Sequence, residues 1–553
     1  MMNLEDVEDK SILFQDFFEW LFDAKSIKNK NINLHSEVDP VLCPNYSDPN
    51  IYAPEQIYAF FNTKSMQRLN RVSQLGLAIN VDSNLYHNRF DHSIGAYNKK
   101  LEELFYNYQD KDWKTFIEQN DMKLYLIAEL IKMAGHDIGH LPLSHALEIQ
   151  IFGKRGVHET IGQKIMLEDP EIHDILENIS PKLPDILKQL YEKDILNFKQ
   201  HDESNYDVDR LDYLVRDALY LGKIKHLPIE KYKSVNILAD ENNQPKKRED
   251  NSIIESSDGQ QTIDVYENES LDNIESALKI RAFQYKDVYV SVPTQVYETA
   301  ISNFIRAFWS SDCKNNELYK FITDLSNSCL GENINIEEYK KWDEVKFYSE
   351  LLHVAETAKD EHLRDLAIMI LPTMKSLLTL TYSFLNMNKK THSYTDEEKR
   401  FLKELKSLIK SDSDLAKKLR DDKFFINNII LLNSDSPFLD TYEKSLVNSF
   451  TSKIKPYKNS EPIYIKDKNN KIYELSEHPD SKYVRNSKTQ KIDTVFANIP
   501  YLRFMGVSED LINKLTKFYP DKPDMSFESS SNKEVNMSPI KVGSKIEDKF
   551  LEI

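Results

Sequence analysis

Cysteine and glycine are both scarce in this chain of 553 residues. The three cysteines, Cys43, Cys313 and Cys329, lie far apart and form no CxxC pair, which excludes a disulfide framework and a zinc ribbon and suits a reducing compartment. The 12 glycines form neither a GxGxxG motif nor a GxxxxGK[ST] loop. If the chain binds a nucleotide, it does so with another kind of site.

The chain also lacks an excess of positive charge and long uninterrupted apolar runs. The net charge of −18 argues against a dedicated binder of duplex DNA, which usually presents a basic face. The most apolar window, residues 366–385, contains Pro372 and Lys375, so we expect a buried pair of helices there rather than a membrane span. The opening residues MMNLEDVEDK lack the basic and apolar parts of a signal peptide, and we therefore expect a cytoplasmic protein without a membrane partner.

The composition, 40% hydrophobic and 29% charged, is that of a folded protein, and the chain is too long for one compact core. Its periodicity predicts a mainly α fold with a helical core, a small β-containing insertion and a C-terminal α+β lobe. The expected divisions are a helical lead-in over 1–60, the core over 61–310 with the insertion at about 227–270, the C-terminal lobe over 311–525 and a flexible tail over 526–553.

Helical periodicity is clearest over residues 66–78, 122–134 and 209–222, and the last of these segments ends at Gly222 as a C-cap. Two strands are expected in the insertion, in KSVNILADENNQ and QTIDVYENE. Later, EPIYIKDKNNKIYELSE predicts a hairpin around an Asn-Asn turn.

Histidine is concentrated in one region: six of the 14 histidines lie between positions 87 and 158, three of them in AGHDIGHLPLSH after the apolar run LYLIAELIKM. The adjacent His136 and Asp137 point about 100° apart on a helix, yet they can share one metal that lies between them. With His92 and Asp209 they form a set of two imidazoles and two carboxylates, which suits Fe, Mn, Zn or Mg. A metal held there would generate hydroxide near neutral pH and polarise a phosphoryl oxygen.

A metal site for phosphate chemistry also needs a proton donor and cations near the leaving group. His87 is expected to be structural. Asp209 and Asp217, eight residues apart, lie close to one face of a helix and favour a shared pocket, whereas Asp212 reads as surface charge and Asp207 as either a helix N-terminal residue or part of the site. The candidates for the proton donor and the cations are His140, His145, His158, Arg89 and Arg210.

The segments MQRLNRVSQLG, HNRFDHSIG, AGHDIGHLPLSH, VHETIG and YDVDRLDYLVRD together resemble the HD-domain metal-dependent phosphohydrolases. Within that family the resemblance is to the deoxynucleoside triphosphate triphosphohydrolases, of the branch that contains SAM and HD domains, and it covers about residues 60–290. It implies an HD-domain helical core and cleavage at the α-phosphorus, which releases a deoxynucleoside and intact triphosphate. It also implies a homo-oligomer that is often regulated by an activating nucleotide.

The resemblance implies a role for each matching position. The implied ligands of a single divalent metal ion are His92, His136, Asp137 and Asp209. The implied handlers of protons and phosphate oxygens are His140, His145 and His158, with Arg89 and Arg210 facing the phosphates. The implied contacts to the deoxyribose are Gln74, Leu75, Tyr213 and Asp217, with Phe283 and Gln284 on a later helix.

Two positions depart from the family pattern. Phe283 stands where the family has tyrosine, and Glu275 falls near the place of a phosphate-binding arginine. A glutamate there would repel a triphosphate unless Lys279 and Arg281 compensate, so the substrate stays open. The alternatives are an HD-type nucleotide monophosphatase or phosphodiesterase acting on a signalling nucleotide, and a non-enzymatic nucleotide sensor. Removal of deoxynucleotides would fit either nucleotide-pool control or defence against phage.

Overall fold

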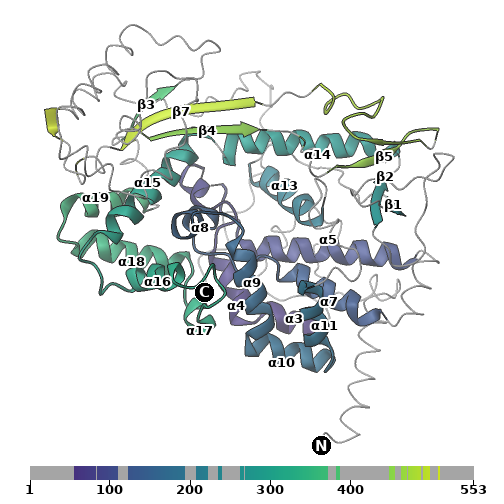
Figure 1. Ribbon diagram of the computed structural model, residues 1–553, viewed down its shortest axis with the longest axis horizontal. Coiled ribbons are helices and arrows are strands. Elements are labelled where there is room, and N and C mark those ends of the chain that lie inside the picture. The colour runs from purple at the N-terminus through teal and green to yellow at the C-terminus, as the bar shows by residue number, and fades with distance from the viewer. Residues whose placement is uncertain are drawn as a thin grey trace, which may run out of the picture.

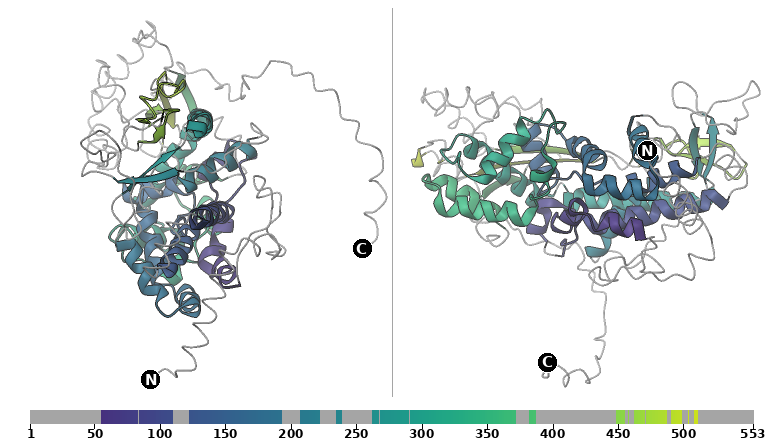
Figure 2. Two further views of the ribbon diagram at one scale, coloured as in Figure 1. Left: turned by 90° about the vertical axis from the view of Figure 1, so that its right-hand side faces the viewer. Right: turned by 90° about the horizontal axis from the view of Figure 1, so that it is seen from below.

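The computed structural model describes residues 55–82, 84–109, 122–192, 207–221, 234–238, 262–266, 268–289, 291–371, 382–386, 448–454, 457, 462–469, 471–486, 490–498, 503 and 508–510. Helices make up most of this part of the chain, and Figures 1 and 2 show the strands gathered on one side of them. The expected mainly α fold is confirmed. The predictions for residues 1–54 and 526–553 lie outside the described residues.

The first half of the chain forms a layered group of helices. They are α3 (Glu55–Phe61), α4 (Lys64–Arg68), α5 (Arg89–Gln109), α7 (Lys123–Ala134), α8 (His145–Phe152), α9 (Val157–Glu168), α10 (Pro170–Ile179), α11 (Leu183–Glu192) and α13 (Val208–Tyr220). Phe61 on α3 packs edge-on against Phe90 and Tyr97 of α5, with ring centroids 5.9 Å and 5.5 Å apart. The expected helices at 122–134 and 209–222 are confirmed as α7 and α13, although Gly222 lies outside the described residues.

The expected single helix over residues 66–78 is wrong. After α4 the chain forms a 3-10 turn over Leu69–Arg71, becomes extended at Val72, pairs Ser73 with Asn88, and turns again at Gly76–Asn80. Gly76 has a φ of +50°, a left-handed conformation that glycine adopts without steric cost. Tertiary contacts made by Ser73 outweigh the helical periodicity, because its backbone and side chain both bond to a distant glutamate.

The second half adds a further group of helices beside the first. They are α14 (Leu271–Gln284), a π-helical turn (Tyr285–Tyr289), α15 (Val292–Trp309), α16 (Glu317–Ser326), α17 (Ile336–Tyr339), α18 (Glu344–Thr357) and α19 (Glu361–Ile370). One hydrophobic cluster runs from Ile57 of α3 to Leu371 after α19, so these helices share a core with the first group. No helix of the described residues is long and apolar enough to cross a membrane.

The strands form two small sheets. The first has the order β1-β2-β5-β6, from β1 (Ser234–Leu238), β2 (Thr262–Tyr266), β5 (Tyr464–Lys466) and β6 (Ile472–Glu474). The expected insertion strands and the expected hairpin are therefore confirmed, and the parallel pairing of β2 with β5 joins them into one sheet. The second sheet has the order β3-β7-β4, from β3 (Tyr382–Asn386), β4 (Asn448–Ile454) and β7 (Gln490–Asn498).

The expected pair of helices over residues 366–385 is half right. Its first part is α19, but Tyr382–Asn386 forms strand β3, which pairs antiparallel with β7. The aromatic residues Tyr382 and Phe384 suit a strand, and an available partner strand decides between the two conformations of a short apolar segment.

Candidate metal centre

Four side chains from three segments of the chain meet, two of them buried (His92 and Asp137) and two partly exposed (His136 and Asp209). His92 lies on α5, His136 and Asp137 lie in the turn after α7, and Asp209 lies in the first turn of α13. His92 Nε2 is 2.8 Å from Asp209 Oδ1 and 3.2 Å from His136 Nε2. Asp137 Oδ2 lies 3.6 Å from His92 Nε2, and its Oδ1 lies 3.6 Å from His136 Nε2. The structure thus brings together all four of the predicted metal ligands.

The two imidazoles are held with one nitrogen facing this centre. His92 Nδ1 lies 2.9 Å from Asp212 Oδ2, and His136 Nδ1 lies 2.8 Å from the carbonyl oxygen of Met133. Because both acceptors take the proton on Nδ1, each Nε2 directs a lone pair inward. Two such lone pairs and two carboxylates at these distances repel one another unless a cation lies between them. The residues present therefore fit a divalent metal ion.

The pKa shifts of these side chains also favour a bound metal ion. Burial opposes protonation of His92, but hydrogen bonds to Asp209 and Asp212 outweigh it and raise the pKa of His92 to about 10. Burial also opposes ionisation of Asp209, yet hydrogen bonds from His136 and His92 hold the pKa of that carboxyl below its usual range. The group attracts positive charge strongly, which a metal ion supplies in place of protons.

Asp212 orients His92, and sequence reasoning missed it. We expected surface charge at this position, which is wrong: Asp212 is buried and also forms an ion pair with Arg216 at 2.9 Å. Gly95 makes the space for it, since a Cβ at position 95 would lie 1.9 Å from Asp212 Oδ1. The glycine three residues after His92 was the available signal, because it permits close approach of α13 to α5.

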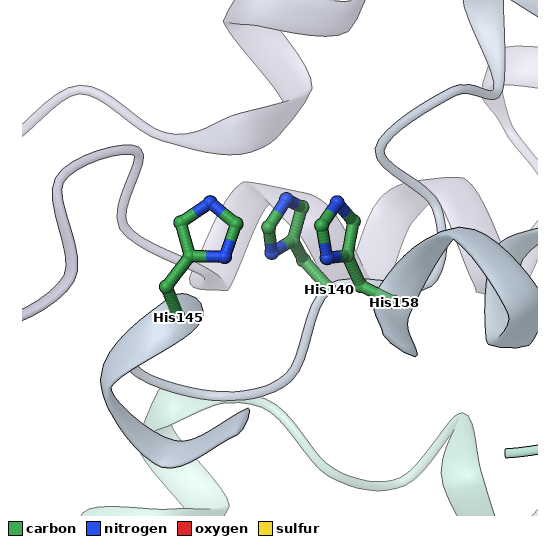
Figure 3. Close-up of side chains that lie close together, drawn as sticks. All are labelled: His140, His145 and His158. Carbon is green, nitrogen blue, oxygen red and sulfur yellow. The ribbon is translucent and has the colours of Figure 1, made fainter. Parts of the chain in front are cut away.

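A second cluster joins His140, His145 and His158 (Figure 3). The rings of His140 and His158 stack with centroids 3.9 Å apart, and the ring of His145 lies 5.0 Å from each of them. His140 Nε2 is 3.2 Å from Asp137 Oδ1, which connects this cluster to the metal centre. Of the three side chains His145 is the most accessible, 38% exposed against 2% for His140 and 11% for His158. His145 is therefore the histidine best placed to meet a substrate.

Glu148 was also missed from the sequence, and it supports two of these histidines. Its Oε2 lies 2.8 Å from His145 Nδ1, and its Oε1 lies 3.0 Å from His158 Nδ1 and accepts the His158 backbone N–H at 2.8 Å. Burial opposes its ionisation, but the hydrogen bonds from His145 and His158 hold the pKa of Glu148 below its usual range. An acidic residue one turn after a histidine on an otherwise apolar helix was the available signal.

The surroundings keep His140 and His145 neutral near pH 7. Burial and the Arg89 guanidinium hold the pKa of His140 well below its usual range. Burial also lowers the pKa of His145, although the bond to Glu148 opposes the shift. With Nδ1 bonded to Glu148, His145 keeps its other ring nitrogen for a group on a substrate.

Because residue 139 is a glycine, α9 packs closely enough to bring His158 beside His140 and His145. A Cβ at Gly139 would lie 2.1 Å from the carbonyl oxygen of His158 and 2.3 Å from the backbone nitrogen of Gly162. Both contacts are with backbone, which cannot move aside as a flexible side chain does. The spacing of AGHDIGH is therefore set by packing as well as by chemistry.

We expect Gly139→Ala to destabilise the protein by about 1–3 kcal/mol, because α9 and His158 must shift to relieve the clash. The same shift should lower activity. The matched control is Gly162→Ala across the same contact, where the added Cβ finds its nearest atom at 3.4 Å and where alanine favours the helix. Thermal unfolding and turnover of both variants measure the effect. Equal unfolding temperatures for the two variants would contradict the assignment.

The two arginines predicted to face phosphates both bond to other groups of the protein. Arg89 donates to Asp137 Oδ2 at 2.7 Å and to the carbonyl oxygen of Gln74 at 3.1 Å. Arg210 lies 3.4 Å from Asp207. Asp207 accepts the Arg210 backbone N–H at 2.7 Å, so it acts as the N-cap of α13.

Two of the predicted sugar contacts, Asp217 and Gln284, lie on α13 or bond to it. Asp217 is fully buried, with His87 Nε2 2.6 Å from its Oδ1 and the Tyr289 hydroxyl bonded to its Oδ2. Gln284 donates to the carbonyl oxygen of Leu214 at 2.7 Å. His87 is thus structural in the expected sense, and Tyr289, in the π-helical turn, joins the network without having been predicted.

The remaining predicted contacts are spread around this network. Gln74 is buried, and its Oε1 has no hydrogen-bond partner among the described residues. Leu75 packs against a small apolar cluster with Leu85 and Val288, and Tyr213 has its ring centroid 6.2 Å from that of His92. Phe283 is 36% exposed.

Glu275 has a role that its position in the sequence did not suggest. Its Oε1 accepts hydrogen bonds from the Ser481 hydroxyl at 2.7 Å and from the backbone N–H groups of Tyr483 and Val484 at 2.8 Å and 3.2 Å. The side chain is buried and anchors the segment after β6 to α14. Glu275 therefore fixes residues 481–484 against α14.

Several known proteins resemble this chain in sequence or in fold. No family model matches the chain. The chain is 27% identical over 356 residues to the uncharacterized protein MG461 of Mycoplasma genitalium, which covers 61% of this chain and 77% of that protein. It is 32% identical over 185 residues to the deoxynucleoside triphosphate triphosphohydrolase SAMHD1 homolog of Dictyostelium discoideum. That match covers 31% of this chain and about a third of the relative, 34%.

Among solved structures, a phosphohydrolase from Bacteroides thetaiotaomicron matches with a TM-score of 0.52 at 19% identity, over 82% of this chain and 98% of that one. At this identity the match shows the fold. The resemblance identified from the sequence is confirmed: the chain is similar to HD-domain proteins and to deoxynucleoside triphosphate triphosphohydrolases, and it has the fold of an HD phosphohydrolase.

Proposed function

We propose that this protein is a metal-dependent deoxynucleoside triphosphate triphosphohydrolase that releases a deoxynucleoside and intact triphosphate. The observation that carries the proposal is the close grouping of His92, His136 and Asp209, with Asp137 3.6 Å from both imidazoles. Asp137 also lies 3.2 Å from His140, which belongs to the second cluster. A set of metal ligands beside a set of proton-transfer groups is what hydrolysis of a phosphate ester requires. The similarity to a relative of that name supports the choice of substrate.

His92, His136, Asp137 and Asp209 would hold a divalent ion of Mn, Fe, Zn or Mg, which when bound acidifies water and polarises a phosphoryl oxygen. The protein's own residues supply the rest. Arg89 holds Asp137 in place through its bond to Oδ2. Asp212 and the carbonyl oxygen of Met133 orient the two imidazoles.

His145 is proposed to deliver the proton that the reaction needs. In hydrolysis water gives up one proton as its oxygen bonds to the α-phosphorus, the bond from that phosphorus to the 5′-oxygen breaks, and the 5′-oxygen takes up a proton. Because His145 is neutral at rest, it takes up the proton that water releases before it donates one to the 5′-oxygen. His145 is the accessible histidine of its cluster, and the Glu148 carboxylate at 2.8 Å stabilises its imidazolium form. Once His145 has given up that proton, Glu148 holds the neutral ring in the same orientation.

Two observations support a sugar as the neighbouring group. The unpartnered Oε1 of Gln74 is a buried acceptor that a hydroxyl group of a substrate would satisfy. Asp217 and Tyr289 form a polar network at α13, with Asp217 one turn after Tyr213. These residues favour a ligand with hydroxyl groups and a flat face, as a deoxynucleoside has.

A second candidate is an HD-type nucleotide monophosphatase or a phosphodiesterase on a signalling nucleotide. Glu275 favours it, because this position holds a buried carboxylate engaged with the C-terminal lobe. An arginine contact to a triphosphate is therefore missing at that place. A substrate with fewer phosphates would not need that contact.

Product analysis separates the two candidates. Purified protein with Mn²⁺ or Mg²⁺ is incubated with the four deoxynucleoside triphosphates, singly and mixed, beside an Asp137→Ala control. We expect chromatography to show deoxynucleosides and intact triphosphate, both absent in the control, because Asp137 contacts both histidine clusters. Inorganic phosphate or a monophosphate as the product would favour the second candidate and reject the first.

The proposal extends to regulation and role. We propose a homo-oligomer in the cytoplasm whose activity depends on an activating nucleotide, and a role in nucleotide-pool control or in defence against phage. The mixed-substrate arm of the product assay tests the activation, since a nucleotide that is needed but not consumed appears as turnover only in mixtures. Sedimentation with and without nucleotides tests the assembly.

A further inference from the structure

The turn that leads into α8 has a rarely adopted backbone conformation and is hydrogen-bonded to a residue far away in the sequence. Leu143 and Ser144 have φ values of 60° and 51°, in the left-handed region that residues other than glycine rarely adopt. His145 is the first residue of α8, directly after this turn, and Glu148 lies in the same first turn of the helix. The direction in which His145 points is therefore set by two strained residues, and such a conformation persists only when its surroundings hold it.

Glu344, at the start of α18, supplies that support from 201 residues away in the sequence. Its Oε1 accepts the backbone N–H of Leu143 at 3.1 Å and that of Ser73 at 2.9 Å, and its Oε2 bonds to the Ser73 hydroxyl. The carboxylate is 8% exposed. Ser73 in turn accepts the Ser144 hydroxyl at its carbonyl oxygen, at 3.0 Å. The Glu344 carboxylate thus holds Leu143 directly and holds Ser144 through Ser73.

Residues just before Glu344 hold the same loop at its other end. The Tyr339 hydroxyl donates to the carbonyl oxygen of Gly139 at 2.7 Å. Arg68 donates to the carbonyl oxygen of Ile138 at 2.7 Å and to that of Trp342 at 3.1 Å, with its guanidinium 4.8 Å from the Tyr339 ring centroid. Tyr339, Arg68 and Glu344 therefore brace residues 138–144, the loop between the metal centre and His145.

We propose that Glu344 is a positioning residue for His145, which it acts on through the Leu143–Ser144 turn. The proposal rests on the proposed function, because it assigns His145 to the reaction. It also adds to the proposed function, because it makes the helical region after residue 310 necessary for the correct position of His145. Glu344 is not proposed to contact the substrate. Its effect falls on the step that His145 serves.

The test compares Glu344→Ala with a matched neighbour, Asp343→Ala. Asp343 caps the same helix by accepting the Lys346 backbone N–H and pairs with Arg71, but it does not bond to the Leu143 turn. We expect Glu344→Ala to lower kcat for deoxynucleoside triphosphates by about 10- to 100-fold with an unchanged KM, since small misplacements of a reacting group cost this much. Asp343→Ala should lower the unfolding temperature and leave kcat unchanged.

Conservative variants keep the test decisive if Glu344→Ala does not fold. Glu344→Gln retains an oxygen for the two backbone N–H groups and should keep kcat within about threefold of the parent protein. Glu344→Asp retains the charge, but its shorter side chain moves the carboxylate away from Leu143. Its kcat should therefore fall as it does in the alanine variant. Equal kcat values for Glu344→Asp, Glu344→Gln and Asp343→Ala would overturn the proposal.

An activity-independent measurement separates failure of this proposal from failure of the proposed function. Hydrogen–deuterium exchange of the backbone in residues 141–148 should accelerate in Glu344→Ala and in Glu344→Asp, and it should stay at the parent rate in Asp343→Ala. If the parent protein turns over no deoxynucleoside triphosphate, the proposed function fails and exchange alone decides whether Glu344 holds the turn. Unchanged exchange in both Glu344 variants would refute the role of Glu344.

Discussion

Asp209→Asn is expected to remove the bound metal and to lower turnover by about 10³-fold or more, since the metal supplies both the acidified water and the polarised phosphoryl oxygen. Asp209 Oδ1 is 2.8 Å from His92 Nε2 and 3.4 Å from His136 Nε2, so it contributes the negative charge closest to both imidazoles. Loss of a partner outside the ligand set costs about 10- to 100-fold in metal affinity, and loss of a ligand should exceed that.

The matched control is Asp207→Asn, the same chemical change two residues earlier. Asp207 caps α13 through the Arg210 backbone N–H, and asparagine caps a helix about as well as aspartate does. Metal content by atomic emission spectroscopy and turnover on the same samples provide the comparison. We expect Asp207→Asn to keep both within about twofold of the parent protein. A full complement of metal in Asp209→Asn would show that Asp209 is not a ligand.

Glu148→Gln is expected to lower kcat by about 10²- to 10⁴-fold while metal content stays unchanged. Glu148 holds the Nδ1 atoms of both His145 and His158, at 2.8 Å and 3.0 Å. A glutamine amide has one acceptor oxygen and one NH2 donor group, so it can accept the Nδ1 proton of only one imidazole. The other imidazole is left in the wrong tautomer or without a partner. It also removes the negative charge that stabilises the imidazolium of His145.

Glu159→Gln is the control for this change, because Glu159 follows His158 directly on α9 but is exposed. Stopped assays at saturating substrate report kcat, and metal analysis on the same preparation shows whether the first centre is intact. We expect Glu159→Gln to behave as the parent protein. Loss of metal together with activity in Glu148→Gln would mean that Glu148 supports the metal centre, and the proposed division of roles would be wrong.

Both predictions concern residues whose roles were reached by different routes. Asp209 follows from the sequence, where its spacing and its resemblance to a family motif mark it as a ligand. Glu148 does not: its place one turn after His145 is a signal, but the same pattern occurs whether such a glutamate faces water or two histidines. Only the packing of α8 against α9 brings His158 to its carboxylate. Asp212 was missed for the same reason and was wrongly expected at the surface.

Much of the fold could be predicted because it is local. The apolar periodicity of α7 and α13, and the short β-rich segments of β1, β2 and the β5–β6 hairpin, depend on residues close to one another in the chain. The errors occur where a distant partner decides the conformation. Ser73 bonds to Glu344 and interrupts the expected helix over residues 66–78. Tyr382–Asn386 pairs with β7 and becomes a strand.

The sequence by itself determined the chemistry of this protein: which imidazoles and carboxylates are present, and the spacing that allows four of them to reach one point. The tertiary structure alone decided how those groups are oriented and which carboxylates support them. The reason is physical. Residue type and periodicity report what a side chain can do and which face it lies on, whereas hydrogen-bond partners such as Glu344 and Leu143, 201 residues apart, are selected by packing across the whole core.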